Sequence, residues 1–394
     1  MHQTHKKILL GITGGIAAYK TAELVRLLIK SGIEVQVVMT QAACQFITPV
    51  TMQALSGKPV YMDMWDNSIP NGMPHIELSR AADAIIVAPA SADFLAKLVH
   101  GRADDLLSTL CLARDCPLVV APAMNKQMWE AAATQRNIKQ LRQDNVTILG
   151  PDSGEQACGE VGLGRMLETE ALAILVKGFL TPKLLADKKI LVTAGATIEK
   201  IDPVRGITNF SSGKMGYAIA QVAADMGAKV TLVSGVSPLD QPYGVKIVAT
   251  ESAEAMYQAV MTNIQQQDIF ISVAAVADYS VESPSNEKIK KGESSLTLKL
   301  KRNKDILADV ASLPNPPFCV GFAAESQDLI KNASQKRLSK KLPLLVANLV
   351  SESMGTDEAT ITLLDDTGTH ALPRSDKITL AQEILTHLSH MLEK

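Results

Sequence analysis

The feature that most constrains the fold is a series of short apolar segments that recur along the chain, with helical stretches between most of them. The segments are rich in Val, Ile, Leu and Ala and show no polar alternation, which is typical of strands buried on both faces of a parallel sheet. The predicted strands begin near residues 6, 35, 84, 117, 188, 229, 268, 318 and 342. This pattern predicts an α/β protein with mainly parallel sheets.

Two of these segments share a plan and suggest two domains. "KKILLGITGG" (6–15) and "KKILVTAGAT" (188–197) each join a lysine pair to an apolar strand and a glycine-containing turn. The pattern breaks at "FLTPKLLADKK" (179–189), where a proline follows a helix and a new strand begins. We therefore expect two Rossmann-like, three-layer domains, with boundaries at 1–180 and 189–394 and a linker at 181–188.

Composition makes several functions improbable. The formal net charge of −2 gives no overall basic field, so neither nucleic acid nor a membrane is expected as a partner. The N-terminal apolar run is too short to span a bilayer and lacks a signal-peptide cleavage site. The 5 cysteines show no zinc spacing, which suits a reducing compartment. We expect a cytoplasmic protein.

Polar and glycine residues follow the predicted strands, where parallel α/β sheets bind ligands. Gly14 and Gly15 stand between a strand and a helix and could let backbone N–H groups approach a phosphate. A tight turn without a ligand explains this pair equally well. A full G-x-G-x-x-G pattern is missing, and the second strand ends in Met39-Thr40 without an acidic residue, which disfavours NAD.

Three residues of the first half could do chemistry, although each has a simpler explanation when taken alone. His75, in an expected loop, could be a surface or helix-start histidine, and Asn125 could be a helix cap. Cys158 could be a small apolar filler. It lies in "SGEQACGEVGLGRM" (153–166), whose glycines indicate a pliable loop.

Taken together, the motifs of the first half resemble the flavin-dependent cysteine decarboxylases, specifically the phosphopantothenoylcysteine decarboxylases. The motifs are "GITGGIAAYK", "PHIELSRAAD", "APASAD", "PAMNKQMW" and "GEQACGEVGLGRM", in family order between residues 8 and 166. Asp93 stands where the family has Asn. The resemblance implies a flavodoxin-like domain that binds FMN through Gly14, Gly15, Thr40, Ser91, Ala92 and Met124.

The same resemblance implies a carboxy-lyase reaction and its residue roles. The thiol of an acyl-cysteine is oxidised to a thioaldehyde, which accepts the electrons as CO2 leaves, and the product is then reduced again. His75 would orient the substrate and move protons, and Asn125 would bind the substrate carboxylate or amide. Cys158 would donate the final proton, since a thiol with an ordinary pKa is protonated at neutral pH.

The second half offers candidate anion sites. "TNFSSGKMGYAIA" (208–220) is no Walker loop, because Thr208 replaces the first glycine and Met215 follows the lysine. Its Ser-Gly-Lys turn could form an anion nest or a simply capped helix start. Two lysine clusters, "NEKIKKGE" (286–293) and "SQKRLSKKLP" (334–343), could serve a polyphosphate or be solvated surface charge.

This half resembles the phosphopantothenate–cysteine ligases. The matching motifs lie between residues 193 and 348: "TAGATIEKIDPVRGITNFSSGKMG", "AAVADY", "EKIKK", "GFAAES" and "QKRLSKKLPLLVAN". The resemblance implies an acid–amino-acid ligase that activates 4′-phosphopantothenate with CTP and couples it to L-cysteine, with Mg2+ held largely by the nucleotide phosphates. Ala196 and Lys304 depart from the family, which has proline at both positions.

The ligase resemblance also assigns residues. Asn209 would hold the acyl-cytidylate, and Lys288 would stabilise charge at the α-phosphate. The remaining implied substrate and nucleotide contacts are Ser211, Ser212, Gly213, Lys214, Met215, Ala274, Asp278, Lys304, Asp305, Ile306, Leu307, Phe322, Lys336 and Lys340.

Three functions are consistent with these motifs. The first is a bifunctional enzyme of coenzyme A biosynthesis that makes 4′-phosphopantetheine. The others are a flavin-binding regulatory subunit and a decarboxylase of peptides with C-terminal cysteine. Reactive residues in both halves favour an enzyme, and a ligase half that makes the decarboxylase's substrate favours the first function. The resemblance implies a homo-oligomer, with flavin-domain trimers and ligase-domain dimers that could close into a dodecamer.

Overall fold

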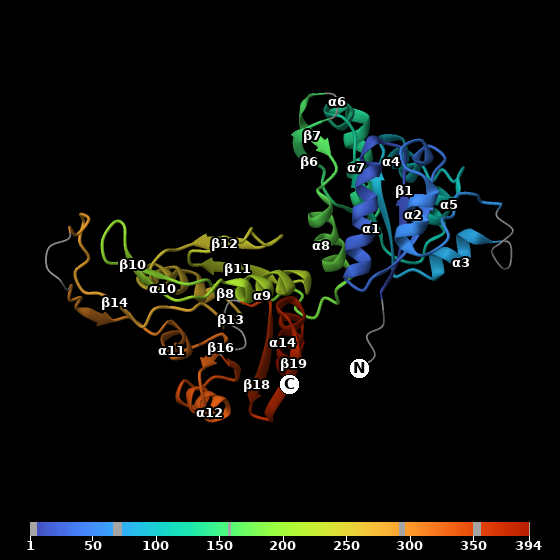
Figure 1. Ribbon diagram of the computed structural model, residues 1–394. Helices are drawn as coiled ribbons and strands as arrows, with labels where there is room; N and C mark the ends of the chain where they lie inside the picture. The colour runs from blue at the N-terminus through green and yellow to red at the C-terminus, as the bar shows by residue number, and fades with distance from the viewer. Residues whose placement is uncertain (1–5, 66–72, 157–158, 291–295, 350–355, 394) are drawn as a thin grey trace. The chain divides into compact units, whose positions relative to one another are not determined.

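The computed structural model describes residues 6–65, 73–156, 159–290, 296–349 and 356–393. Contacts divide the chain into two compact units, Met1–Leu180 and Thr181–Lys394 (Figure 1). Each unit has a mainly parallel sheet between two layers of helices, which confirms the predicted α/β class. Among the helices of these described ranges, none has the length and apolar character needed to cross a bilayer.

The N-terminal unit is built on a parallel sheet with the strand order β2-β1-β3-β4-β5. The central strands are almost fully buried, which explains their continuous apolar sequences. The strands are β1 (Lys7–Ile12), β2 (Glu34–Met39), β3 (Ala84–Ala90), β4 (Leu118–Pro122) and β5 (Thr147–Ile148).

Helices cover both faces of this sheet. Neighbouring residues of β1 show the two layers, since Leu10 packs with α1, α2 and α8 while Leu9 packs with α4, α5 and α7. The first layer consists of α1 (Lys20–Lys30), α2 (Pro49–Ser56) and α8 (Thr169–Leu180). The second layer consists of α4 (Ala92–Val99), α5 (Leu106–Ala113) and α7 (Ala132–Gln143).

Short elements decorate the N-terminal unit. An antiparallel hairpin of β6 (Asp152–Glu155) and β7 (Val161–Arg165) packs against α6 (Lys126–Glu130). Two 3-10 turns, η1 (Ile16–Tyr19) and η2 (Ala43–Gln45), follow β1 and β2.

The loop predicted around His75 is wrong, because His75 lies in α3 (Pro74–Arg80), which packs against α5. Proline at the first helical position has a backbone angle already suited to a helix, and Glu77 in the first turn complements the helix dipole.

The C-terminal unit has a larger sheet with the order β12-β11-β8-β13-β16-β17-β18-β19. The strands from β12 to β17 run parallel, whereas β18 and β19 form an antiparallel edge that sequence analysis did not predict. The strands are β8 (Lys189–Ala194), β11 (Lys229–Ser234), β12 (Lys246–Ala249), β13 (Ile269–Ser272), β16 (Phe318–Glu325), β17 (Leu344–Leu349), β18 (Glu358–Asp365) and β19 (Gly368–Asp376).

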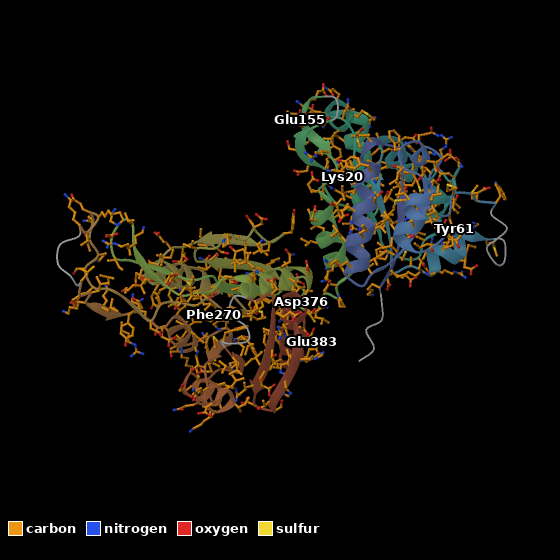
Figure 2. All side chains as sticks on the ribbon, viewed as in Figure 1. Lys20, Tyr61, Glu155, Phe270, Asp376 and Glu383 are labelled. Atoms are coloured by element: carbon orange, nitrogen blue, oxygen red, sulfur yellow. The ribbon has the colours of Figure 1, made fainter. Side chains whose placement is uncertain are left out.

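Two helical layers enclose this sheet as well. Phe270 is fully buried on β13 (Figure 2) and packs in the layer that contains α10, α11 and α12. The opposite face is covered by α9 and α14. The helices are α9 (Lys214–Asp225), α10 (Ala253–Asn263), the 3-10 turn η4 (Ile264–Gln266), α11 (Ile306–Ala311), α12 (Leu329–Ser339) and α14 (Lys377–Leu392).

Two small antiparallel ribbons interrupt the alternation of strands and helices in the C-terminal unit. They pair β9 (Ile198–Lys200) with β10 (Gly206–Thr208), and β14 (Tyr279–Val281) with β15 (Leu300–Arg302). The first ribbon lies between β8 and α9.

Candidate active sites

The first candidate site of the N-terminal unit lies at the carboxyl ends of its strands. A Cβ atom at Gly14 would lie 2.6 Å from the Cβ of Ala42, so glycine allows the turns after β1 and β2 to approach each other. A Cβ atom at Gly15 would meet nothing within 4 Å, which leaves open space beside the backbone there. Thr40 joins the same turns, since its N–H donates to the carbonyl of Ile12 at 3.1 Å.

Thr13 links the turn after β1 to the end of β3. Its buried hydroxyl donates to the carbonyl of Pro89 at 2.7 Å and accepts from the N–H of Ser91 at 2.9 Å. The Ser91 hydroxyl caps α4 by accepting from the N–H of Phe94 at 3.2 Å, and Ala92 is the first residue of α4. Thr13 therefore positions a predicted cofactor residue, although it was not itself predicted as one.

Asn125 caps α6, because its side-chain oxygen accepts from the N–H of Met128 at 2.9 Å. The preceding residue, Met124, donates its N–H to the carbonyl of Gly164 at 2.9 Å. A Cβ atom at Gly164 would lie 2.5 Å from the carbonyl oxygen of Met124, so the hairpin needs glycine to approach this closely. These contacts fix the β6–β7 hairpin beside Asn125.

The connection between β6 and β7 carries Cys158, which lies outside the described residues. Gln156, just before it, accepts from the N–H of Lys126 at 2.9 Å. Lys20 of α1 (Figure 2) is buried, and its Nζ donates to Glu168, just beyond the hairpin, at 3.0 Å. Both ends of the segment that carries the predicted proton donor are therefore anchored.

His75 lies on α3. Among the hydrogen bonds and ion pairs of the described residues, none joins His75 to another predicted residue of the decarboxylase site. The structure thus brings together Gly14, Gly15, Thr40, Ser91, Ala92, Met124 and Asn125 at one edge of the sheet.

The candidate site of the C-terminal unit is a cavity of about 550 Å³. It lies at the carboxyl ends of the parallel strands. Every predicted site residue of this half lines it except Lys288. The predicted residues that line it are Asn209, Ser211, Ser212, Gly213, Lys214, Met215, Ala274, Asp278, Lys304, Asp305, Ile306, Leu307, Phe322, Lys336 and Lys340.

The start of α9 forms one wall of this cavity. Gly213, at the N-cap, has φ of 78°, a left-handed conformation that favours glycine. A Cβ atom there would also lie 3.2 Å from the backbone of Gly195. No side chain caps this helix, so its first N–H groups and the positive end of its dipole face the cavity. This geometry suits a phosphate or a carboxylate.

Lysines supply cationic charge to the cavity. Lys336 donates from Nζ to the carbonyl of Phe322 at 3.0 Å, and burial, reinforced by the nearby Lys340, lowers the pKa of Lys336. Lys340 pairs with Asp305 at 2.5 Å. Burial alone would raise the pKa of Asp305, but the hydrogen bond from Lys340 holds it below its usual value. Lys214 pairs with Asp357.

Two asparagines fix the loop after β13. Asn209 donates from Nδ2 to the carbonyl of Ala275 at 2.9 Å, and Asn303 donates to that of Ala277 at 2.8 Å. Asn303 was missed by sequence analysis, as were Asn348 and Lys377, which also line the cavity. Asn348 lies in the last part of β17, so the rule that favours polar residues at strand ends could have found it. Lys377 reaches the cavity from the start of α14 and gives no such local signal.

Lys288 lies beside a buried carboxylate that sequence analysis also missed. Asp202 accepts from the N–H of Ile289 at 3.1 Å, and Arg205 donates to the Ile289 carbonyl at 3.0 Å. The hydrogen bond from Arg205 holds the pKa of Asp202 well below its usual value. Asp202 and Arg205 therefore clamp the backbone next to Lys288 onto the β9–β10 ribbon.

Two family models match the chain, one in each half. Residues 1–181 match the family model described as "Flavoprotein", and residues 185–392 match "DNA/pantothenate metabolism flavoprotein C-terminal domain". The coenzyme A biosynthesis bifunctional protein CoaBC of Vibrio vulnificus is 51% identical over 393 residues, which cover 98% of each chain. The protein of the same name from Escherichia coli is 47% identical over 391 residues, which cover 97% of this chain and 96% of the relative.

A solved structure also matches. The crystal structure of the C-terminal domain of a coenzyme A biosynthesis bifunctional protein CoaBC is 40% identical to the matching part of this chain. The match covers 54% of this chain and 98% of the solved one, with a TM-score of 0.47.

Proposed function

The chain belongs to the family of coenzyme A biosynthesis bifunctional proteins, and from this premise we propose how its two units divide the chemistry. It is an enzyme with phosphopantothenoylcysteine decarboxylase and phosphopantothenate–cysteine ligase activities, as the motifs predicted. We assign decarboxylation to residues 1–180 and ligation to residues 189–394, with residues 181–188 as the linker.

We propose that the 550 Å³ cavity binds CTP and 4′-phosphopantothenate. The observation that carries this assignment is the uncapped start of α9 opposite the lysines of α12 and its C-terminal end, which offers donors and positive charge for several phosphate groups. The substrate carboxylate attacks the α-phosphorus and pyrophosphate leaves. The amine of L-cysteine then attacks the acyl carbon, and CMP leaves. Mg2+, held largely by the nucleotide, would supply positive charge that helps pyrophosphate to leave.

Asn209 and Lys288 have different tasks in this proposal. Asn209 lies on the cavity wall, where its amide can hydrogen-bond the acyl-cytidylate. Lys288 does not line the cavity, so its side chain would have to turn toward the α-phosphate after the substrates bind. Asp202 and Arg205 then act as positioning residues, because they fix the backbone from which Lys288 extends.

We propose that the strand-end edge of the N-terminal unit binds FMN. The residues fit this group, because the turn after β1 leaves open space at Gly15 and Ser91 places a hydroxyl at the start of α4. Exposed Ile16 and Met128 offer apolar surface to an aromatic ring system. When bound, FMN supplies the reversible oxidation of the substrate thiol.

The chain's own residues orient the substrate and move its protons. The side-chain oxygen of Asn125 is used by the cap, so its amide N–H groups are the donors that can hold the substrate carboxylate. His75 would accept a proton during oxidation of the thiol, and Cys158 would donate a proton to the decarboxylated carbon. Arg165 would attract the anionic substrate.

Copies of this chain would complete the decarboxylase site. His75 has no hydrogen bond or ion pair to the other predicted site residues among the described ones, which suggests that it serves the site of a neighbouring copy. Exposed Tyr19, Phe46 and Val50 lie on segments that follow β1 and β2, where contacts between copies would bury them. A trimer of this unit and a dimer of the C-terminal unit would produce a dodecamer.

Mass spectrometry of products tests both halves at once. The purified protein, given 4′-phosphopantothenate, L-cysteine, CTP and Mg2+, should yield 4′-phosphopantetheine and CO2. A Cys158→Ser variant should stall at an oxidised, decarboxylated species. If the wild type stops at phosphopantothenoylcysteine, the decarboxylase proposal fails while the ligase proposal stands. Normal turnover by Cys158→Ser would remove Cys158 from the mechanism.

A further inference from the structure

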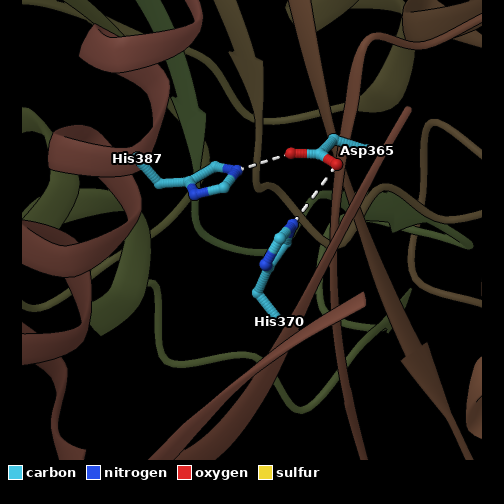
Figure 3. A group of neighbouring side chains, drawn as sticks. All are labelled: Asp365, His370 and His387. Carbon is cyan, nitrogen blue, oxygen red and sulfur yellow. Dashed lines mark hydrogen bonds and ion pairs between the residues drawn. The ribbon is translucent and has the colours of Figure 1, made fainter. Parts of the chain in front are cut away.

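A cluster of potential metal ligands lies away from both proposed catalytic sites. Asp365 ends β18, His370 lies on β19, and His387 comes from α14 (Figure 3). One potential ligand atom from each residue lies within 4.8 Å of the other two, and no other such group of His, Cys, Asp or Glu occurs among the residues that the structure describes.

The cluster lies at the opposite end of the strands from the nucleotide cavity. β18 begins at the cavity, which Ala359 and Ile361 line, and it ends at Asp365. α14 also runs from the cavity toward the cluster. Lys377 at the start of this helix lines the cavity, and His387 lies ten residues further along. At 1.5 Å per residue this separates the two positions by about 15 Å along the helix.

The three side chains converge on one point. The Nε2 atom of His387 lies 2.7 Å from Oδ2 of Asp365, and the Nε2 atom of His370 lies 3.3 Å from Oδ1 (Figure 3). The two rings lie 4.8 Å apart between centroids. Bond lengths near 2.0–2.1 Å place neighbouring ligand atoms of a tetrahedral ion roughly 3.3 Å apart, which is close to the His370–Asp365 distance and longer than the His387–Asp365 distance.

The carboxylate is held as a metal ligand usually is. Its side chain is only 2% exposed, and the turn orients it through hydrogen bonds from Thr367 N–H at 2.7 Å, Thr367 Oγ1 at 2.6 Å and Gly368 N–H at 3.0 Å. Hydrogen bonds of this kind orient a ligand and tune its affinity for metal.

The charge balance also favours a cation. Among the ion pairs of the described residues, Asp365 meets only the two histidines, which are charged only when protonated. With neutral imidazoles, the buried negative charge has no full counter-charge, and a buried charge is costly without one. The side chains of His370 and His387 are 38% and 24% exposed, so water can reach the remaining coordination positions.

We propose that Asp365, His370 and His387 bind one divalent transition-metal ion of the zinc class, which fastens α14 to the β18–β19 hairpin. Two imidazoles and one carboxylate suit Zn2+, Co2+ or Ni2+ better than Mg2+, which prefers oxygen ligands. The site is therefore separate from the Mg2+ that the ligase reaction is proposed to use. Because it joins residues from three elements, the ion would stabilise the C-terminal unit.

Co2+ binding to the full-length, flavin-loaded protein tests this proposal. After chelator treatment, the protein is dialysed against Co2+, and bound metal and the visible difference spectrum are measured. We expect one equivalent with nitrogen and oxygen ligands, displaced by Zn2+ but not by Mg2+. The equivalent should be lost in His370→Gln and retained in the control His390→Gln, which changes an exposed histidine of α14, the helix that carries His387.

A third variant measures how the turn supports the ion. Thr367→Val removes a hydroxyl that contacts the carboxylate, and it should weaken Co2+ affinity by about 10–100-fold. Retained ligase activity and thermal unfolding without metal would show that each variant is folded. Failure of the wild type to bind Co2+, or equal binding by His370→Gln, would overturn the proposal and identify the cluster as a hydrogen-bond network only.

Discussion

In both units the candidate site lies beyond the carboxyl ends of a parallel sheet, and the proposed ligand is anionic. The two units differ in how closely the predicted site residues lie together. In the C-terminal unit, Asn209 and all the other predicted contacts except Lys288 surround one cavity. In the N-terminal unit, predicted residues share a sheet edge, while His75 stands apart on α3. Similar topology thus gathers the predicted residues of one unit around a single cavity, whereas in the other unit His75 lies on a helix that precedes β3.

The residues that lead into the first long helix of each unit show a second difference. In the C-terminal unit, left-handed Gly213 starts a 12-residue helix whose first N–H groups lack a side-chain cap, and lysines stand nearby. In the N-terminal unit, Gly14-Gly15 leads into a 3-10 turn, and Lys20 beyond it pairs with Glu168. The C-terminal arrangement suits a highly charged polyphosphate, whereas the N-terminal one suits a single phosphate with an aromatic group.

Replacing His75 should produce the largest separation of the two activities. His75→Asn removes the proposed proton acceptor, so decarboxylation should fall by roughly 10²–10⁴-fold, as for loss of general acid–base catalysis. Ligation should be unchanged, and mass spectrometry should show phosphopantothenoylcysteine accumulating. A matched ligase variant, Lys336→Gln, should show the reverse. Decarboxylation within a few-fold of wild type would exclude His75 from the proton-transfer step.

Two replacements of Asn125 distinguish its role as the cap of α6 from its proposed role in binding the substrate carboxylate. Asn125→Asp keeps the oxygen that caps α6 but replaces the amide donor with a charge that repels the substrate carboxylate. Decarboxylation should fall by roughly 10²–10³-fold with stability retained. Asn125→Ala should also lose about 0.5–2 kcal/mol of stability. Activity and thermal unfolding distinguish the two effects, and an active Asn125→Asp enzyme would limit Asn125 to capping.

Two glycine replacements, Gly14→Ala and Gly216→Ala, should each destabilise the unit in which the glycine lies. A Cβ atom at Gly14 would lie 2.6 Å from the Cβ of Ala42, and one at Gly216 would lie 2.5 Å from the Cβ of Ala194. Overpacking of this kind costs about 1–3 kcal/mol. Gly14→Ala should impair flavin retention and Gly216→Ala should impair ligation.

The space around Gly15 provides the control for that pair. Its backbone is extended, with φ of 174°, and nothing lies within 4 Å of an added Cβ atom. Gly15→Ala should therefore leave the unfolding temperature nearly unchanged. A loss of stability equal to that of Gly14→Ala would mean that close packing at Gly14 is not the cause.

The smallest effect concerns the clamp beside Lys288. The hydrogen bond from Arg205 lowers the pKa of Asp202 in the folded protein, so Asp202 stabilises the C-terminal unit above its ordinary pKa of about 3.9. This contribution is lost as pH falls through the lowered pKa. Asp202→Asn should therefore show a weaker decrease in stability below about pH 5. Parallel pH profiles of wild type and variant, measured by denaturant unfolding, would contradict this linkage.

Much of the fold followed from local sequence patterns. Continuous apolar strands separated by helices predicted the parallel sheets, because only helices on both faces can bury such strands. Ser91 and Phe322 were expected from the family resemblances, and the structure places Ser91 directly after β3 and Phe322 within β16. The loop around His75 was predicted wrongly because the helix start signal of Pro74 was overlooked.

The sequence by itself therefore determined the fold class, the family and most of the chemically capable residues, because those depend on patterns within one segment. Only the tertiary structure decided how Lys377 reaches the cavity, how Asp202 holds Ile289, and how His387 meets Asp365. The partners in the last two contacts are 87 and 22 residues apart. No local periodicity encodes such meetings, since they arise from the packing of whole strands and helices against a shared sheet.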